Sequence, residues 1–302
     1  MNGRESLRRY AYLSIAAALV TIGLKSGAYF LTGSVGLLSD ALESLVNLAA
    51  AIVALAALVV ASRPPDDSHE FGHDKIEYFS AGIEGTLILV AAGSIVVTSL
   101  ERLFRPQPLE QLGLGIAISI IASGVNLGVA LTLMRVGKQR DSITLQADAR
   151  HLMTDVWTSV GVLAGVGLVA LTGIERLDPI VALIVAANIV RIGIVLVRGS
   201  FDGLMDTSVS VEDRESIDRV LRVFQGQGIQ FHALRTRQAA ARRFMTVHVL
   251  VPPQWTIKKG HDVVEQIEHA IRAAVPNAHV LTHLEPLGDP AAQEDVTLDR
   301  SS

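Results

Sequence analysis

Two groups of polar side chains interrupt long apolar runs and share the same spacing. The first group has offsets of 0, 3 and 7 residues and consists of Asp40, Glu43 and Asn47. The second group repeats these offsets with Asp148, His151 and Asp155. Residues spaced in this way lie on one face of a helix, and a carboxylate within hydrocarbon is costly unless it is paired or functional. The spacing therefore predicts one polar site between two membrane helices.

Four of these side chains form two pairs with i,i+4 spacing, Glu43 with Asn47 and His151 with Asp155. Four convergent nitrogen and oxygen donors suit a tetrahedral divalent cation, and the chain has no cysteine to supply sulfur. A ligand imidazole must be neutral and a ligand carboxylate ionised, so protons compete with the metal. The pattern predicts exchange of a divalent cation for protons. The alternative is that Asn47 and Asp155 only hydrogen-bond neighbouring helices.

The two aspartates that precede the pairs, Asp40 and Asp148, point to opposite mouths of the predicted site. They are predicted to attract cations where these enter or leave. The alternative is a solvated carboxylate at each helix end.

The composition indicates that these groups lie in a membrane protein. The chain has 302 residues, of which 50% are hydrophobic and 19% charged, and its mean hydropathy is +0.41. Six apolar runs are long enough to span roughly 30 Å of hydrocarbon. They cover approximately residues 10–31, 35–61, 79–100, 112–133, 152–171 and 180–197. A net charge of −4 argues against a nucleic-acid partner.

Basic residues predict the orientation of the helices. They are concentrated in the segments before the first run, between the second and third, and between the fourth and fifth. The positive-inside rule then places both termini in the cytoplasm.

The last third of the chain reads as a soluble domain. Its apolar pattern predicts a helix over 210–224, strands over 229–237 and 244–251, a helix from Thr256 to about Ala274, and a strand over 278–284. This order predicts an α+β sandwich with the helices on one face of a three-stranded sheet. We therefore expect a transmembrane domain over 1–208, a cytoplasmic domain over 209–287 and an unstructured segment over 288–302.

Two further groups of potential metal ligands lie outside the apolar runs. Asp66, His69 and His73 have the spacing of a compact loop site, although a plain polar loop is the alternative. The soluble domain carries six of the nine histidines, with Glu285 beside the last, and these are His232, His248, His261, His269, His279 and His283. A metal site would explain this density, whereas each one alone reads as a surface histidine.

The chain resembles the cation diffusion facilitators, and in particular their bacterial iron and zinc efflux branch. Nearly the full length contributes, through Thr32-Gly33-Ser34-Val35, Glu43-Ser44-Leu45-Val46-Asn47, Phe71-Gly72-His73-Asp74-Lys75, Ala147-Asp148 to Asp155, and Leu234-Arg235-Thr236-Arg237-Gln238 followed by Arg243-Phe244. The resemblance implies six transmembrane helices in a bacterial inner membrane, a cytoplasmic ferredoxin-like domain, a homodimer and proton-coupled export of divalent metal.

The resemblance also implies roles for individual residues. The transport site is Glu43, Asn47, His151 and Asp155, and the loop site is Asp66, His69 and His73. The binuclear site of the soluble domain is His232, His248, His261, His283 and Glu285. A charge pair between subunits is formed by Lys75 and Asp206, for which two independently solvated charges are the alternative.

The chain departs from the branch at the second helix, where two aspartates are usual and Glu43 and Asn47 stand here. In the soluble domain, Glu285 replaces the usual aspartate and Leu284 replaces a residue that is sometimes polar. Loss of one carboxylate predicts weaker binding and fewer exchangeable protons. His151 favours zinc, with iron, cobalt, manganese and cadmium left open.

The leading hypothesis is a divalent metal and proton antiporter. The alternative is a metal-sensing or scaffolding membrane protein with an inactive transport site. An intramembrane metalloenzyme is disfavoured because the chain has no His-Glu-x-x-His motif and no general base beside the ligands.

Overall fold

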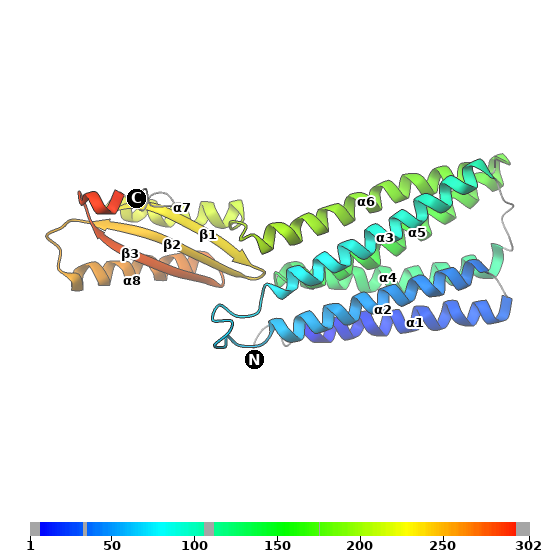
Figure 1. The fold of residues 1–302 in the computed structure, drawn as a ribbon, viewed down its shortest axis with the longest axis horizontal. Helices are drawn as coiled ribbons and strands as arrows, with labels where there is room; N and C mark the ends of the chain where they lie inside the picture. The colour runs from blue at the N-terminus through cyan, green and yellow to red at the C-terminus, as the bar shows by residue number, and fades with distance from the viewer. Residues whose placement is uncertain (1–6, 33–34, 106–111, 175, 294–302) are drawn as a thin grey trace. The chain divides into compact units, whose positions relative to one another are not determined.

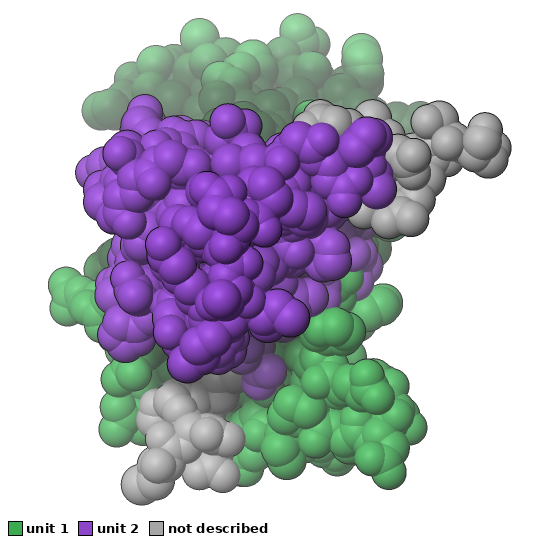
Figure 2. Space-filling view, turned by 90° about the vertical axis from the view of Figure 1, so that its left-hand side faces the viewer, with its two compact units in different colours: residues 1–202 green, residues 203–302 purple. Residues whose placement is uncertain are grey.

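The computed structural model describes residues 7–32, 35–105, 112–174 and 176–293. For some helical residues, Asp40 and Glu43 among them, it describes only the backbone. The chain divides into two compact units, residues 1–202 and 203–302 (Figure 2).

The first unit consists of long helices that are joined by loops (Figure 1). Its six long helices are α1 (Arg8–Thr32), α2 (Val35–Ala61), α3 (Ile76–Phe104), α4 (Leu112–Gln139), α5 (Ile143–Thr172) and α6 (Leu177–Leu204). Among the described residues, five of these helices contain a stretch that is long and apolar enough to cross a membrane. The predicted helical membrane domain is confirmed.

Local sequence sets both ends of α5. Ser142 precedes the helix, and its side-chain oxygen accepts a hydrogen bond from the backbone N–H of Leu145, as expected of an N-cap. Glu77, at the start of α3, adds a second restraint because its Oε2 accepts from Ser142 Oγ at 2.7 Å and from the backbone N–H of Thr144 at 3.1 Å. Gly173 then ends the helix with a φ of 71°, which glycine adopts without strain. α3 and α5 therefore start at the same level.

Glycines allow α3 and α6 to pack closely. A Cβ atom on Gly85 would lie 2.9 Å from Leu196 Cβ and 3.0 Å from the backbone nitrogen of Val197. One on Gly193 would lie 2.7 Å from Leu89 Cγ. Ser200 strengthens the same contact by donating to the Tyr78 carbonyl at 2.6 Å. Small residues at such contacts are typical of helix packing in membranes.

The second unit contains α7 (Val211–Gln225), β1 (Gln230–Ala239), β2 (Arg242–Val251), α8 (Ile257–Ala274) and β3 (Ala278–Pro286). The predicted order of helix, strand, strand, helix, strand is confirmed. The strands form one sheet in the order β1-β2-β3, with β1 antiparallel and β3 parallel to β2. Thr256 caps α8, as predicted, by accepting from the backbone N–H of Lys259. Pro290–Gln293, within the segment expected to be unstructured, form a short 3₁₀ helix.

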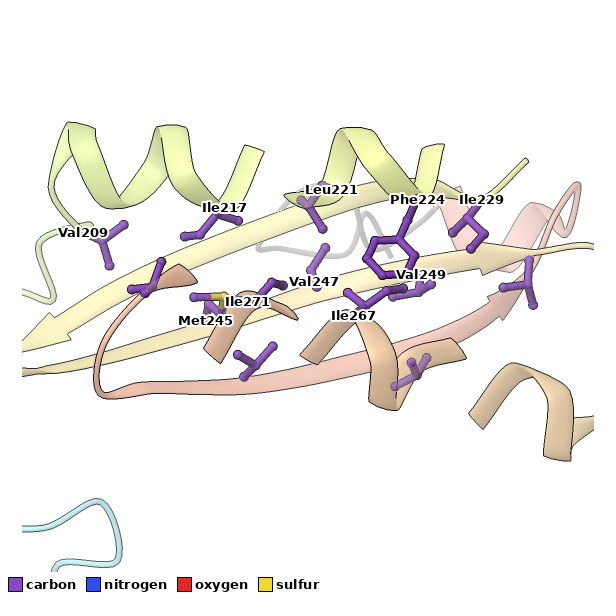
Figure 3. Close-up of a cluster of buried hydrophobic side chains, with 14 residues drawn as sticks. Val209, Ile217, Leu221, Phe224, Ile229, Met245, Val247, Val249, Ile267 and Ile271 are labelled. Carbon is purple, nitrogen blue, oxygen red and sulfur yellow. The ribbon is translucent and has the colours of Figure 1, made fainter. Parts of the chain in front are cut away.

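The core of the second unit lies between one face of the sheet and both helices (Figure 3). Alternate residues of β2, Met245, Val247 and Val249, pack in one cluster with Ile217 of α7 and Ile267 of α8. Because successive side chains of a strand point to opposite faces, His248 lies on the other face. The sheet therefore has a face that the helices leave open for polar side chains.

Candidate functional site

Three of the four residues predicted for the membrane site meet at mid-length of α2 and α5. Asn47 and Asp155 are hydrogen-bonded through Asn47 Nδ2 and Asp155 Oδ2, and His151 Nε2 lies 2.6 Å from Asn47 Oδ1. Their exposed fractions are 3% for Asn47, 4% for His151 and 8% for Asp155. We call Asn47, His151 and Asp155 the membrane cluster. These contacts would also suit a purely structural role for Asn47, so the transport site stays a prediction.

The amide of Asn47 connects the imidazole to the carboxylate. Its oxygen can accept only if His151 carries a proton on Nε2, whereas the other ring nitrogen, Nδ1, has no partner among the described residues. A metal bound to Nε2 would displace that proton and break the contact with Asn47. The three side chains thus hydrogen-bond one another without a metal, and they contain the nitrogen and oxygen donors to bind one.

A fourth side chain, which sequence reasoning missed, joins the cluster from α4. Asn126 Nδ2 donates to Asp155 Oδ2 at 3.0 Å, and Asn126 is 2% exposed. Its Oδ1 has no hydrogen-bond partner in the described part of the chain. The available signal was one amide inside the apolar run of α4, where polar groups are rare unless functional.

Of the other polar residues predicted on α2 and α5, the structure describes the side chain of Asp148 only. The side chains of Asp40 and Glu43 lie outside the described part of the structure. Asp148 is 1% exposed and accepts from Ser14 Oγ at 3.1 Å. It is therefore a buried carboxylate, and the alternative of a solvated helix end is wrong for Asp148.

The predicted loop residues converge between α2 and α3, and we call them the loop cluster. His73 Nε2 lies 3.2 Å from Asp66 Oδ2, and His69 Nδ1 lies 3.3 Å from Asp66 Oδ1. One ligand atom from each residue lies within 4.8 Å of the others. Desolvation works to raise the pKa of Asp66, but hydrogen bonds from the backbone N–H groups of His69 and Ser68 outweigh it and lower the pKa. The carboxylate is therefore ionised at neutral pH and ready to bind a cation.

The open face of the sheet gathers a second preformed group. The strand register aligns three histidines in one row, His232 of β1, His248 of β2 and His283 of β3. Glu285 Oε2 lies 2.7 Å from His232 Nε2, and its Oε1 lies 3.2 Å from His248 Nδ1. The second contact lacks the alignment of a hydrogen bond, because Nδ1 of His248 has no such partner among the described residues. We call His232, His248 and Glu285 the tail cluster.

Other histidines of the second unit take different places. His283 Nε2 lies 3.5 Å from Glu285 Oε1 and is more exposed than the tail cluster. A hollow of about 420 Å³ opens beside it, lined by His248, His283 and Arg235 among others. His279 stacks on Phe244 with 5.1 Å between ring centroids. His261, on α8, is exposed and belongs to neither the loop cluster nor the tail cluster.

The predicted charge pair concerns two subunits, which one chain does not test. Lys75 stands at the N-cap of α3. Asp206 has a φ of 59° and pairs within its own unit with Arg237, whose Nη1 lies 3.3 Å from Asp206 Oδ1. The pairing of Lys75 with Asp206 therefore stays a prediction.

Comparison with known proteins gives matches to both units. Residues 11–205 match the family model of the cation efflux transmembrane domain, and residues 209–287 match that of the cation efflux protein cytoplasmic domain. An uncharacterized transporter of Synechocystis is 53% identical over 283 residues, which cover 94% of this chain and 91% of that protein. The cation-efflux pump FieF of Klebsiella pneumoniae is 29% identical over 95% of each chain. FieF of Salmonella arizonae is 30% identical over 92% of each chain.

Proposed function

The chain belongs to the cation efflux family, and on that basis we propose that it is a proton-coupled antiporter that exports zinc ahead of other divalent cations. Membership makes the protein a multi-span membrane transporter of divalent metal cations, and not an enzyme. The matched cytoplasmic domain supports formation of a dimer. The identity of the metal, the role of protons and the orientation are our proposal.

One observation carries the proposal, namely the contact between Asn47, His151 and Asp155 at mid-length of two membrane helices. Buried polar groups at this depth are costly, so their convergence favours a role in moving an ion. Glu43 precedes Asn47 by one turn on α2 and is the proposed fourth ligand.

Proton exchange follows from the chemistry of these ligands. Zinc needs a neutral imidazole nitrogen and ionised carboxylates. Protonation of the same groups releases the ion. A cluster that opens alternately to each side of the membrane therefore carries zinc in one direction and protons in the other.

Zinc uptake into proteoliposomes tests this coupling. With the purified protein in the bilayer, an imposed pH gradient should accelerate zinc uptake, and collapse of the gradient by a protonophore should slow it. Uptake that is the same with and without the gradient would contradict the antiport mechanism.

Asn47 provides a test of metal preference. Replacing Asn47 by Asp adds an anionic oxygen in place of a neutral amide, so we expect tighter zinc binding and transport that depends more steeply on pH. The preference among metals is measured by growth rescue of an efflux-deficient bacterium that expresses the wild-type protein or Asn47→Asp. Zinc, iron, cobalt, manganese and cadmium are tested in parallel. If the wild-type protein restores growth in excess manganese but not in excess zinc, the choice of zinc is contradicted.

Orientation is open to a separate test because the chain has no cysteine. A single cysteine at Ser68, in the loop between α2 and α3, should react with an impermeant thiol reagent only when the cytoplasmic face is accessible. A cysteine at Thr172, near the end of α5, should show the opposite accessibility. Labelling of Ser68→Cys from outside intact cells would reverse the proposed topology.

A sensing or scaffolding role is the second candidate, and the preformed tail cluster favours it. In both cases we propose that the loop and tail clusters bind zinc from the cytoplasm. Zinc uptake separates the two functions, because a sensor would bind zinc without moving it.

A further inference from the structure

Two carboxylates outside the membrane cluster are buried between α3 and α5. Glu84 is 0% exposed and Asp148 is 1% exposed. Ser80 Oγ donates to Glu84 Oε1 at 3.2 Å, and Ser14 Oγ donates to Asp148 Oδ1 at 3.1 Å. In the described part of the chain, the second oxygen of each carboxylate, Glu84 Oε2 and Asp148 Oδ2, has no hydrogen-bond partner. Each carboxylate thus has one oxygen that accepts a hydrogen bond and one that does not, among the described residues.

The two carboxylates lie at the same depth and act on each other. Glu77 binds the start of α5 through Ser142, and Glu84 follows Glu77 by two turns. Asp148 follows Ser142 by six residues, so both side chains lie about 10 Å along their helices, at about 1.5 Å per residue. Asp148 is close enough for its charge to act on Glu84. His151 follows Asp148 by one turn, which places this pair beside the membrane cluster.

Two buried like charges require a positive counterpart. Mutual repulsion and loss of hydration oppose ionisation of both groups. Among the described residues, no basic side chain forms an ion pair with Glu84 or Asp148. The counterpart must therefore come from outside the protein, as a cation or, when no cation is present, as a proton.

The donors define the class of cation. Two carboxylates and two serine hydroxyls offer only oxygen, which suits hard and borderline divalent ions such as Mn²⁺ and Zn²⁺. Without an imidazole, such a site should hold Zn²⁺ less tightly than the membrane cluster, which contains His151. Weak binding is expected of a site that the ion occupies transiently during transport, because the ion must also leave it.

We propose that Glu84 and Asp148 form a second divalent-cation site, which holds the transported ion on its way to or from the membrane cluster. This inference rests on the proposed function for the direction of passage but not for the binding itself. It gives Asp148 a specific partner on α3, which the spacing on α5 alone could not reveal.

Equilibrium dialysis of the full-length protein in lipid nanodiscs tests the site with Mn²⁺ or Zn²⁺ as the probe. Because the loop and tail clusters also bind metal, the count is made in a parent that carries His151→Ala and Asp155→Ala. Adding Glu84→Gln or Asp148→Asn to this parent should remove one further ion per chain at saturation. Adding Glu101→Gln, an exposed position on the same helix α3, should leave the count unchanged.

A milder variant, Ser80→Ala, tests the site without replacing either carboxylate, so that a loss of binding is not confused with misfolding. Ser80→Ala keeps both carboxylates and removes only the hydroxyl that supports Glu84, so the affinity of the weakest site should fall about tenfold. An unchanged ion count and affinity in Glu84→Gln, Asp148→Asn and Ser80→Ala would overturn the proposal.

Transport measurements separate this inference from the proposed function. If the wild-type protein transports zinc and the Glu84→Gln and Asp148→Asn variants bind as many ions as the background with His151→Ala and Asp155→Ala, the second site fails while export stands. If Glu84→Gln loses an ion but the wild-type protein moves no metal, export fails while the second site stands.

Discussion

Asn47 is the residue that joins the two halves of the membrane cluster. Its amide nitrogen bonds Asp155 and its oxygen lies against His151 Nε2. An aspartate at this position would repel Asp155, whereas an amide can donate to one neighbour and accept from the other. The chain therefore has one carboxylate fewer and a more complete network of hydrogen bonds when no metal is present.

Asn126 should act through Asp155 as a positioning residue. Replacing Asn126 by Ala removes the 3.0 Å hydrogen bond to Asp155 Oδ2, and loss of such a partner typically costs about 10- to 100-fold in metal affinity. Zinc titration of the purified protein measures the loss. Thr132→Val on the same helix is the control, because the Thr132 hydroxyl bonds the Gly128 carbonyl of its own helix. Equal zinc affinity in Asn126→Ala and the control would refute this role.

The sequence could predict the members of the site that repeat along one helix, but not those that enter it singly. The spacing of Asn47, His151 and Asp155 identified three residues that the structure brings together. Asn126 is the one member that α4 contributes to the membrane cluster among the described residues. Glu84 follows Glu77 and Ser80 at the same offsets of 0, 3 and 7 residues, but that spacing does not show that Glu84 lies beside Asp148. Their roles depend on how α3 and α4 pack against α5, which periodicity does not determine.

At the scale of elements, close packing of α3 on α6 depends on glycine. The Cβ of a Gly85→Ala variant would meet Leu196 Cβ and the backbone of Val197, and backbone cannot move aside as a side chain can. We expect a loss of about 1–3 kcal/mol in stability from overpacking. Thermal unfolding in detergent measures it.

Gly93→Ala on the same helix is the matched control. A Cβ at Gly93 meets nothing within 4 Å, and alanine in a helix is more stable than glycine by up to about 1 kcal/mol. The Gly93→Ala variant should therefore be as stable as the parent or slightly more so. A Gly85→Ala variant that unfolds at the same temperature as Gly93→Ala would show that the contact between α3 and α6 is looser than described.

The elements themselves were largely predictable. The apolar runs predicted the six helices, although α5 begins at Ile143 and not near 152. The reason is that its first two turns carry polar residues inside the bundle, where Glu77 accepts from Ser142 and Thr144, and Ser14 donates to Asp148. Hydropathy detects lipid-facing residues and therefore misses the part of a helix that faces other helices.

The molecule as a whole combines two units with different cores. The first packs long helices, and the second has its own cluster of aliphatic side chains between a sheet and two helices. The change in composition near residue 203 was visible in the sequence. The row of histidines across the sheet depended on strand register, which the sequence did not show.

Zinc binding by the second unit should stabilise it. A ligand that binds only the folded state at about 100 times its Kd adds about 2.7 kcal/mol, so excess zinc should raise the unfolding temperature of the second unit. Glu285→Gln should abolish most of this increase, since Glu285 contacts both His232 and His248. His269→Gln, an exposed position on α8, is the control. A full increase in the Glu285→Gln variant would exclude the tail cluster as the zinc site.

The most direct test of the central claim is the initial rate of zinc uptake into proteoliposomes under a pH gradient, for the parent, His151→Ala and Asp155→Ala. If the membrane cluster holds the transported ion, both variants should transport at no more than about a tenth of the parental rate, because each loses a zinc ligand. His269→Gln should transport at the parental rate. Parental rates in both His151→Ala and Asp155→Ala would contradict the account.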